Sequence, residues 1–214
     1  MSDHHEHHHG HANDQGLKGA LRYLRWLPQM WRSEINDAVV AEAQIRPGER
    51  VVDIGAGLGA GATRAAATGA HVIAVEPTPF MRRILRARQV VGRHRDLEVV
   101  DGTAERMPVA DHSVDVVVAV NTMHHWVDVD RGVAEVARVL RAGGRVLLVD
   151  EDFDDPTHPE HERFSSEHDA DHHGFTMVDA AGMRERMQAV GLQNVDAANV
   201  RLADRPVIRV SATA

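Results

Sequence analysis

The sequence predicts an α/β fold, a doubly wound, mostly parallel sheet of seven strands with helices on both faces. Two observations carry this prediction. Short apolar runs alternate with helix-like segments along most of the chain, as in parallel strands joined by crossover helices. The last two apolar runs are instead separated by a tight turn near Asp204 and Arg205, which predicts a hairpin and an antiparallel last strand.

Each element follows from its local pattern. Apolar runs bounded by glycine, proline or polar residues predict the strands. They lie at residues 50–54, 71–75, 97–100, 114–120, 145–150, 195–201 and 206–211. Helices are expected at residues 60–68, 79–91, 131–140 and 177–190. Gly143 and Gly144 supply a helix stop and a turn before the fifth strand.

The ends of the chain and one internal segment depart from this pattern. Residues 1–16 carry six histidines and little apolar content, which predicts a disordered tail. Residues 17–45 predict two short helices broken at Pro28, an N-terminal helical cap. Residues 46–214 form the main domain, with an acidic and histidine-rich insertion at 151–175 in which no core is expected.

Composition limits the classes of function. The formal net charge of −8 argues against nucleic acid as a partner. The arginines between residues 82 and 95 recur at helical spacing, which indicates a solvated helix face. The chain has no cysteine, which removes disulfides, thiolate nucleophiles and cysteine-bound zinc. No apolar run approaches the roughly 20 residues of a membrane span and no signal-peptide core is visible, so the cytoplasm is the expected compartment.

The most informative motif is a glycine turn that follows a carboxylate. Asp53 lies in the first apolar strand, two residues before the turn formed by Gly55, Ala56 and Gly57. Such a turn lets a ligand approach the backbone, but the glycines also fit a dinucleotide site, so an NAD-linked oxidoreductase is one alternative. Asp53 favours another ligand. A carboxylate repels a pyrophosphate and attracts S-adenosylmethionine (SAM), which carries an ammonium and a sulfonium.

A second acidic residue ends the next strand. Glu76 follows the apolar run at 71–75, where nucleotide-binding folds hold a ribose diol. A carboxylate there accepts hydrogen bonds from both vicinal hydroxyls, and bonds to a charged acceptor contribute roughly 1.5–3 kcal/mol. Asp53 and Glu76 together therefore predict a SAM site.

Residues 46–150 resemble the class I SAM-dependent methyltransferases, especially the small Methyltransf_11 type, whose fold is Rossmann-like. Five motifs in order carry the resemblance, at residues 53–59, 76–78 with Met81, 102–108, 111–115 and 121–126. A more distant resemblance is to actinobacterial sugar O-methyltransferases, including those of methylmannose polysaccharide synthesis.

The resemblance implies where the cofactor lies. The backbone of Gly55, Ala56 and Gly57 would meet the methionine part of SAM, with Asp53 oriented toward its ammonium. Glu76 would hold the ribose.

The remaining cofactor contacts are also implied by the resemblance. Asn121 would approach the sulfonium from the other side. Thr103 stands where the family commonly has an aspartate for the adenine amino group, which leaves adenine recognition more dependent on the backbone. The residues expected around the adenine are Pro77, Thr78, Met81, Gly102, Thr103 and Ala104.

Two histidines are the candidate catalytic residues. His124 and His125 follow the fourth strand, where class I enzymes place residues that face the acceptor. Either can serve as the general base that a hydroxyl acceptor needs, unless it packs structurally beside Trp126. The sequence thus predicts methyl transfer to a small molecule, with a hydroxyl acceptor favoured over nitrogen or carbon. A SAM-binding accessory protein without catalysis is a further alternative, and a monomer or a homodimer is expected.

Oxygen and imidazole side chains after the fifth strand are candidate metal ligands. Glu151, Asp152, His172 and His173 would lie near the acceptor, where Mg²⁺ could use one or two carboxylates and substrate oxygens. Two alternatives stay open: a solvated acidic insertion, and a pocket in which His172 and His173 act without metal.

Overall fold

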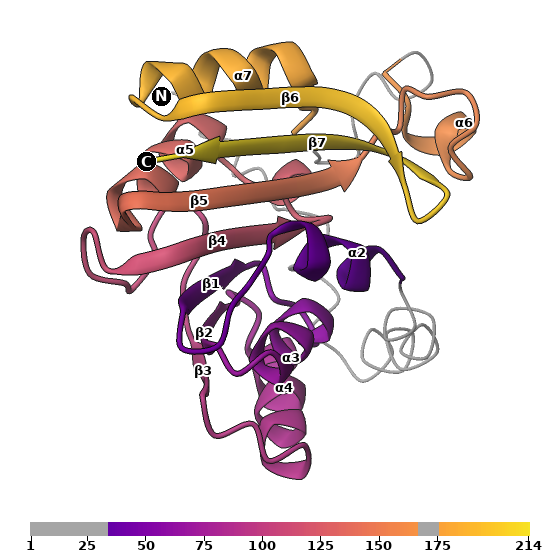
Figure 1. The fold of residues 1–214 in the computed structure, drawn as a ribbon. Helices are drawn as coiled ribbons and strands as arrows, with labels where there is room; N and C mark the ends of the chain where they lie inside the picture. Colours follow the sequence, from indigo (N-terminus) through magenta and orange to yellow (C-terminus); the bar gives the residue numbers. More distant parts are fainter. Residues whose placement is uncertain (1–33, 167–175) are drawn as a thin grey trace, which may run out of the picture.

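The computed structural model describes residues 34–166 and 176–214, which form one twisted seven-stranded sheet flanked by helices (Figure 1). The expected tail at 1–16, most of the N-terminal cap at 17–45 and part of the insertion lie outside the described residues. Within the described ranges, no helix combines the length and apolar character needed to cross a membrane.

The strand order confirms the predicted fold class. The sheet runs β3-β2-β1-β4-β5-β7-β6, and all pairs from β3 to β5 are parallel. β7 is antiparallel to both of its neighbours, as the hairpin turn predicted. The strands are β1 (Arg50–Ile54), β2 (His71–Val75), β3 (Leu97–Val100), β4 (Val114–Val120), β5 (Leu140–Glu151), β6 (Gln193–Leu202) and β7 (Arg205–Thr213).

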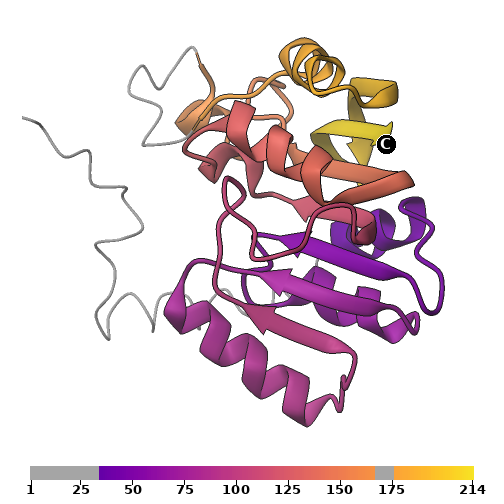
Figure 2. The same cartoon turned by 90° about the vertical axis from the view of Figure 1, so that its left-hand side faces the viewer.

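Helices cover both faces of the sheet, because neighbouring strand residues point to opposite sides (Figure 2). Val51 packs in one core cluster with Ile35, while Val52 packs in the other with Val133. The first cluster joins the sheet to α2 (Glu34–Glu42), α3 (Ala60–Ala67) and α4 (Pro79–Val91). The second joins it to α5 (Val129–Val139) and α7 (Ala180–Ala189).

β5 begins earlier than the sequence predicted. Leu140 is buried and pairs with Val114, and the ladder then shifts register before Arg145 pairs with Val116. The expected turn at Gly143 is therefore part of the strand segment, where its positive φ of 75° suits glycine. The stop after α5 is correct, but it is followed by an irregular ladder instead of a free turn.

The insertion contributes to the core, contrary to the sequence-based expectation. Phe153, His158 and Ser165 are buried, although acidic residues surround them in the sequence. The Phe153 ring lies 4.9 Å from the His158 ring and 5.4 Å from that of Phe164. Phe164 ends the short helix α6 (His161–Phe164), which lies beyond the carboxyl end of β5 in Figure 1. These rings thus pack against one another in the segment that follows β5.

Candidate cofactor and acceptor site

The predicted site residues gather at the carboxyl ends of β1, β2, β4 and β5. The chain builds the sheet outward from β1 to β3 and then crosses back to add β4 on the other side of β1. Open α/β sheets bind ligands beside such a reversal, at the carboxyl ends of the strands. The geometry thus places Asp53, Glu76, Asn121 and His124 at one edge of the sheet.

The glycine turn after β1 is packed tightly against the end of β4. Gly55 has a φ of +65°, and a Cβ at this position would lie 2.8 Å from the Thr122 Cβ and overlap the Thr122 hydroxyl. Gly57 also has a positive φ, 53°, and a Cβ there would make only an ordinary contact, 3.9 Å from the Gly55 carbonyl oxygen. Glycine is therefore required at residue 55 for conformation and for space, and at residue 57 for conformation.

Glu76 holds this turn from the side of β2. It is 3% exposed, and its Oε2 accepts a hydrogen bond of 2.8 Å from the Gly57 amide. Its Oε1 accepts one of 2.7 Å from the Thr78 amide. Each carboxylate oxygen has a second lone pair, so both can still accept from ribose hydroxyls. The predicted ribose ligand is thus in contact with the predicted glycine turn.

Asp53 lies beneath the first turn of α3. The side chain is 3% exposed, and a Cβ at Gly61 would lie 3.1 Å from both Asp53 Oδ2 and Asn36 Oδ1. The pKa of Asp53 is raised to about 7, chiefly by burial; a hydrogen bond from the Ala62 amide opposes this shift and the Glu76 charge adds to it. A cation bound nearby would favour the charged carboxylate.

The arginines of α4 are not simply a solvated face, as the sequence had indicated. Arg82 is 8% exposed and makes a bidentate ion pair with Asp101 through two bonds of 2.9 Å. It also donates to the Glu76 carbonyl at 2.7 Å. Arg88 donates to the Leu58 carbonyl at 2.6 Å, next to the glycine turn. These two side chains brace the ends of β2 and β3 and the loop after β1.

The segments expected around the adenine follow β2 and β3. Pro77, Thr78 and Thr103 are exposed, whereas Ala104 is buried. Thr103 pairs with Arg106 through two backbone hydrogen bonds, of 3.3 and 3.2 Å, in a tight turn. The side chain of Thr103 is thus available at this turn, and its role toward adenine stays a prediction, as do those of Met81 and Gly102.

Asn121 directly follows β4 in an unusual conformation. Its φ is +51°, a region that asparagine tolerates better than most residues, and its amide donates to the Val149 carbonyl at 2.8 Å. The side-chain Nδ2 donates to Glu151 Oε1 at 2.6 Å. Among the described residues, the buried Oδ1 has no hydrogen-bond partner. A buried, unpaired acceptor is costly, which points to a ligand that completes it.

His124 forms a buried pair with Asp150. It lies in the short 3₁₀ helix η1 (Met123–His125) after β4, and its Nδ1 is 2.7 Å from Asp150 Oδ1. The His124 backbone amide donates to Asp150 Oδ2 at 2.7 Å, and Asp150 is 0% exposed. Burial lowers the pKa of His124, but the charge and hydrogen bond of Asp150, with the charge of Glu151, raise it above the usual value.

The two candidate histidines differ in their surroundings. His125 is exposed, and its ring lies 4.0 Å from that of His124. No local pattern indicates that Asp150 pairs with His124, because 26 positions separate them. The one signal in the sequence is the acidic end of the fifth strand, which equally fits the metal-ligand prediction.

The metal expectation is not supported by the carboxylates that the structure describes. Glu151 accepts from Asn121, from His158 Nε2 at 2.8 Å and from Arg205 at 2.9 Å. Asp152 accepts from the Asn199 side chain at 2.7 Å. Residues 34–166 and 176–214 contain no group of three histidine or acidic side chains that could hold a metal ion. The other two candidates, His172 and His173, lie outside the described residues.

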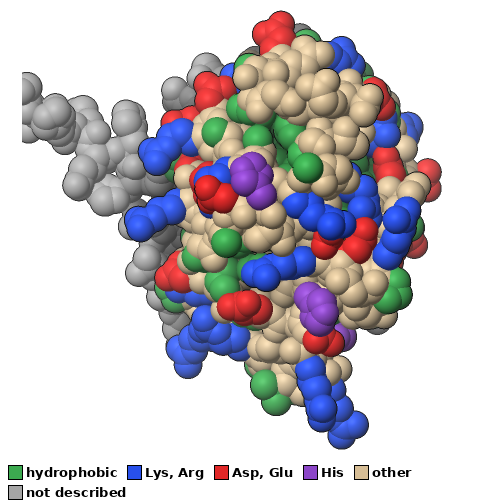
Figure 3. Space-filling view, turned by 60° about the vertical axis from the view of Figure 1, so that its left-hand side comes forward, with side chains coloured by type: hydrophobic (Ala, Val, Ile, Leu, Met, Phe, Trp, Pro, Cys, Tyr) green, Lys and Arg blue, Asp and Glu red, His purple; other side chains and the backbone are tan. Residues whose placement is uncertain are grey.

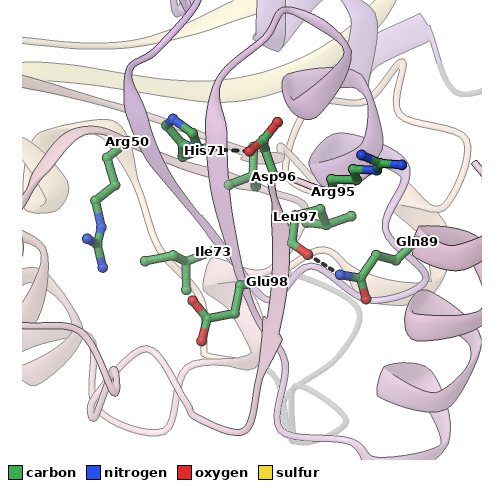
Figure 4. A pocket seen from close by; sticks show the side chains of 9 residues that line it. Arg50, His71, Ile73, Gln89, Arg95, Asp96, Leu97 and Glu98 are labelled. Carbon is green, nitrogen blue, oxygen red and sulfur yellow. Dashed lines mark hydrogen bonds and ion pairs between the residues drawn. The ribbon is translucent and has the colours of Figure 1, made fainter. Parts of the chain in front are cut away.

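A pocket of about 520 Å³ lies at the opposite end of the strands. Arg50, His71 and Leu97, which begin β1, β2 and β3, line it together with Gln89 and Asp96 (Figure 4). His71 pairs with Asp96 at 3.2 Å, and Gln89 donates to the Leu97 carbonyl. The pocket contains none of the predicted site residues, so it is separate from the candidate site at the carboxyl ends of the strands.

Charged side chains of both signs share the surface in Figure 3. Basic and acidic groups are interspersed on the face shown, without a continuous basic stripe. Several arginines pair with acidic neighbours, as Arg138 does with Asp111 and Glu135 and Arg145 does with Glu49.

Comparison with known proteins agrees with this geometry. Residues 52–148 match the Methyltransf_11 family of methyltransferase domains. The matched region includes the glycine turn, Glu76 and the segment from Asn121 to His124. Over these residues the chain is similar to class I SAM-dependent methyltransferase domains. This confirms the family resemblance that the sequence motifs indicated.

Individual relatives of this methyltransferase domain match part of their length. An uncharacterized methyltransferase of Mycobacterium tuberculosis is 47% identical over 102 residues, 47% of this chain and 39% of the relative. A demethylmenaquinone methyltransferase of a Mycobacterium species (strain KMS) is 37% identical over 129 residues, 60% of this chain and 50% of the relative. The chain thus spans half or less of the length of these curated relatives.

Solved structures share the fold. Phosphoethanolamine N-methyltransferase 2 of Haemonchus contortus, in complex with SAM, aligns with a TM-score of 0.72 at 18% identity. The alignment covers 85% of this chain and 52% of the other.

Proposed function

We propose that the domain transfers the methyl group of SAM to a hydroxyl of a small-molecule acceptor, with His124 as the general base. The observation that carries this proposal is the buried His124–Asp150 pair at the carboxyl end of the sheet. A hydroxyl must lose its proton when it attacks, and a histidine held by a carboxylate is suited to take it.

The chain's own residues fit SAM. The glycine turn after β1 leaves its backbone open to a ligand, and Glu76 offers acceptor capacity beside it. Asp53 would favour the ammonium through its charge, and Asn121 would approach the methionine part of SAM from the other side. Bound SAM supplies an electrophilic methyl group on a sulfonium. The protein's part is mainly to bring the acceptor oxygen into line with that methyl group.

The hydrogen bond to Asp150 determines which nitrogen of His124 can act. When Nδ1–H donates to Asp150, Nε2 is the nitrogen that accepts a proton. The Asp150 carboxylate then stabilises the imidazolium that forms, as in other histidine–aspartate pairs. Asp150 is therefore a positioning residue for the base.

A carbon acceptor is the second candidate, because one relative is a demethylmenaquinone methyltransferase. Removal of a proton from a ring hydroxyl makes the ring carbon as well as the oxygen electron-rich, so the same base serves both reactions. The sugar acceptor expected from the more distant resemblance, a nitrogen acceptor and the monomer or homodimer stay predictions.

The hydrogen bond between the glycine turn and Glu76 argues against an NAD-linked oxidoreductase. The Gly57 amide donates to Glu76, so a negative charge occupies a position that a pyrophosphate needs. Asp53 lies directly behind the same turn.

Label transfer tests the proposal. The protein is incubated with SAM labelled in the methyl group and a metabolite extract, and the products are analysed by mass spectrometry and NMR. Transfer to oxygen supports the proposal, transfer to ring carbon supports the second candidate, and SAM binding without transfer supports an accessory protein.

His124→Ala should then lower turnover by about 10²–10⁴-fold while the affinity for S-adenosylhomocysteine holds. The exposed neighbour provides the matched control, since His125→Ala should keep most of the turnover. Equal loss in both variants, or none in His124→Ala, would contradict the assigned base.

A further inference from the structure

We propose that Glu151 is a positioning residue which fixes the Asn121 amide so that its oxygen accepts the α-ammonium of the bound cofactor. The proposal rests on the SAM site argued above and adds a contact that neither the motifs nor the family match assigns.

Glu151 is held by three donors, which fix its position. Arg205 and His158 Nε2 both donate to Oε2, at 2.9 and 2.8 Å, and Asn121 Nδ2 donates to Oε1 at 2.6 Å. His158 Nδ1 in turn accepts the Glu160 amide at 3.1 Å, so the proton must be on Nε2. The buried His158 is therefore a fixed donor, and the carboxylate has little freedom to rotate.

This arrangement determines the orientation of the Asn121 amide. A carboxylate only accepts hydrogen bonds, so the NH₂ group of Asn121 must face Glu151 and the oxygen must point away from it. Among the described residues that oxygen is buried without a partner. If the amide were rotated by 180°, the Asn121 oxygen would face the Glu151 carboxylate, and both groups are acceptors. Glu151 therefore disfavours the rotated amide.

The position of Asn121 indicates which group of the cofactor would donate to its side-chain oxygen. The next residue, Thr122, packs against Gly55, so the end of β4 lies against the turn that would hold the methionine part of SAM. The polar hydrogens of that part of the cofactor are on its ammonium. A buried carbonyl-type oxygen satisfied by a cationic N–H gives a charge-assisted hydrogen bond, which is stronger than a neutral one.

Calorimetry with two ligands tests the contact without an acceptor or turnover. S-adenosylhomocysteine carries the ammonium, whereas 5′-methylthioadenosine shares its adenosine and sulfur but lacks the amino-acid part. Asn121→Gly removes the amide while accepting the positive φ of residue 121 without strain. Affinity for S-adenosylhomocysteine should fall by about ten- to hundredfold, and that for 5′-methylthioadenosine should hold.

The role of Glu151 is tested by a double-mutant cycle. Glu151→Gln should weaken S-adenosylhomocysteine binding when Asn121 is present and have no further effect when residue 121 is glycine. Asn199→Ala is the matched control, because it breaks an asparagine–carboxylate bond to Asp152, one residue along the chain, and should leave both affinities unchanged.

The outcomes separate this proposal from the proposed function. If S-adenosylhomocysteine does not bind the unaltered protein, the SAM site itself is wrong. If it binds but Asn121→Gly changes neither affinity, or weakens both ligands equally, the ammonium contact is overturned. Additive effects of Glu151→Gln and Asn121→Gly would overturn the positioning role alone.

Discussion

At the scale of single residues, Asp53 combines a functional position with a cost in stability. Its carboxyl group is buried, and its pKa in the folded chain is raised from 3.8 to about 7. The folded state therefore holds a proton that the unfolded state releases between these values. The free energy of unfolding should fall as the pH rises from about 4 to 7, because of this group.

Asp53→Asn should remove that part of the pH dependence. The difference in unfolding free energy between variant and unaltered protein, measured by urea denaturation, should shift in favour of the variant as the pH rises from 4 to 7. A difference that is constant with pH would show that Asp53 titrates normally. The cofactor should reverse the penalty, because its ammonium favours the carboxylate form.

His124 gives a second prediction at the scale of single residues, because its pKa depends on the charge of Asp150. Asp150 raises the pKa of His124 above 6.5 against the effect of burial. Asp150→Asn removes the charge but leaves the burial, so the pKa should drop, which histidine-ring NMR measures directly. Asp152→Asn is the control, since that carboxylate bonds to Asn199 and should not move the titration.

The sign of the linked stability follows from the same shift. A histidine whose pKa is raised by folding contributes stability below its unfolded pKa, and this is lost as the pH rises through the folded pKa. A His124 signal that titrates below 6.5 in the unaltered protein would contradict the pair as an electrostatic unit.

At the scale of elements, the glycine turn after β1 is fixed by its contact with β4. Gly55→Ala introduces a Cβ at a positive φ and also forces the Thr122 hydroxyl to move. It should cost about 1–3 kcal/mol from the backbone alone, with overpacking added, and should weaken S-adenosylhomocysteine. Thermal unfolding and calorimetry measure the two effects.

Gly48 supplies the matched control for that variant. It has a φ of +82° with no atom within 4 Å of a built Cβ, so Gly48→Ala adds backbone strain without a clash. Gly48→Ala should be destabilised less than Gly55→Ala and should bind S-adenosylhomocysteine normally. Equal behaviour of the two variants would mean that the contact between the turn and Thr122 does not matter.

The elements also show which features a sequence can predict. The bounds of β1 to β4 and α4 agree with those expected, because each is a local apolar pattern between breakers. β5 differs because the pairing of Leu140 with Val114 depends on a distant strand. Phe153 is buried within an acidic segment because β5 and α6 lie next to it, which local composition does not reveal.

The same reason explains what was found and missed in the site. Glu76 and the glycine turn could be assigned because the carboxyl ends of adjacent parallel strands meet at one edge. The bonds from Asp150 to His124 and from Arg82 to Asp101 join residues 26 and 19 positions apart, and no periodicity encodes them. Carboxylates that the sequence suggested for a metal are used in the structure to hold side chains.

At the scale of the whole molecule, the site is assembled from both halves of the sheet. Asp53 lies in β1 and Glu76 follows β2, whereas Asn121 follows β4 and Asp150 lies in β5. A ligand bound between the two halves should therefore stabilise the folded chain as a unit. Saturation with S-adenosylhomocysteine at about 100 times its Kd adds about 2.7 kcal/mol, which for a domain of this size raises Tm by about 5–10 °C.

Glu76→Ala should remove between half and nearly all of that rise in Tm at the same ligand concentration, since the expected loss of affinity is about ten- to hundredfold. Each variant is compared with its own ligand-free Tm, because Glu76 also binds the amides of Gly57 and Thr78. Glu105→Ala is the matched control. Glu105 Oε1 accepts from the amides of Val127 and Asp128, so this change also removes two amide contacts but should keep the ligand-induced rise. NAD should produce no rise in any variant, and a rise with NAD that Glu76→Ala enhances would identify the candidate site as a dinucleotide site instead.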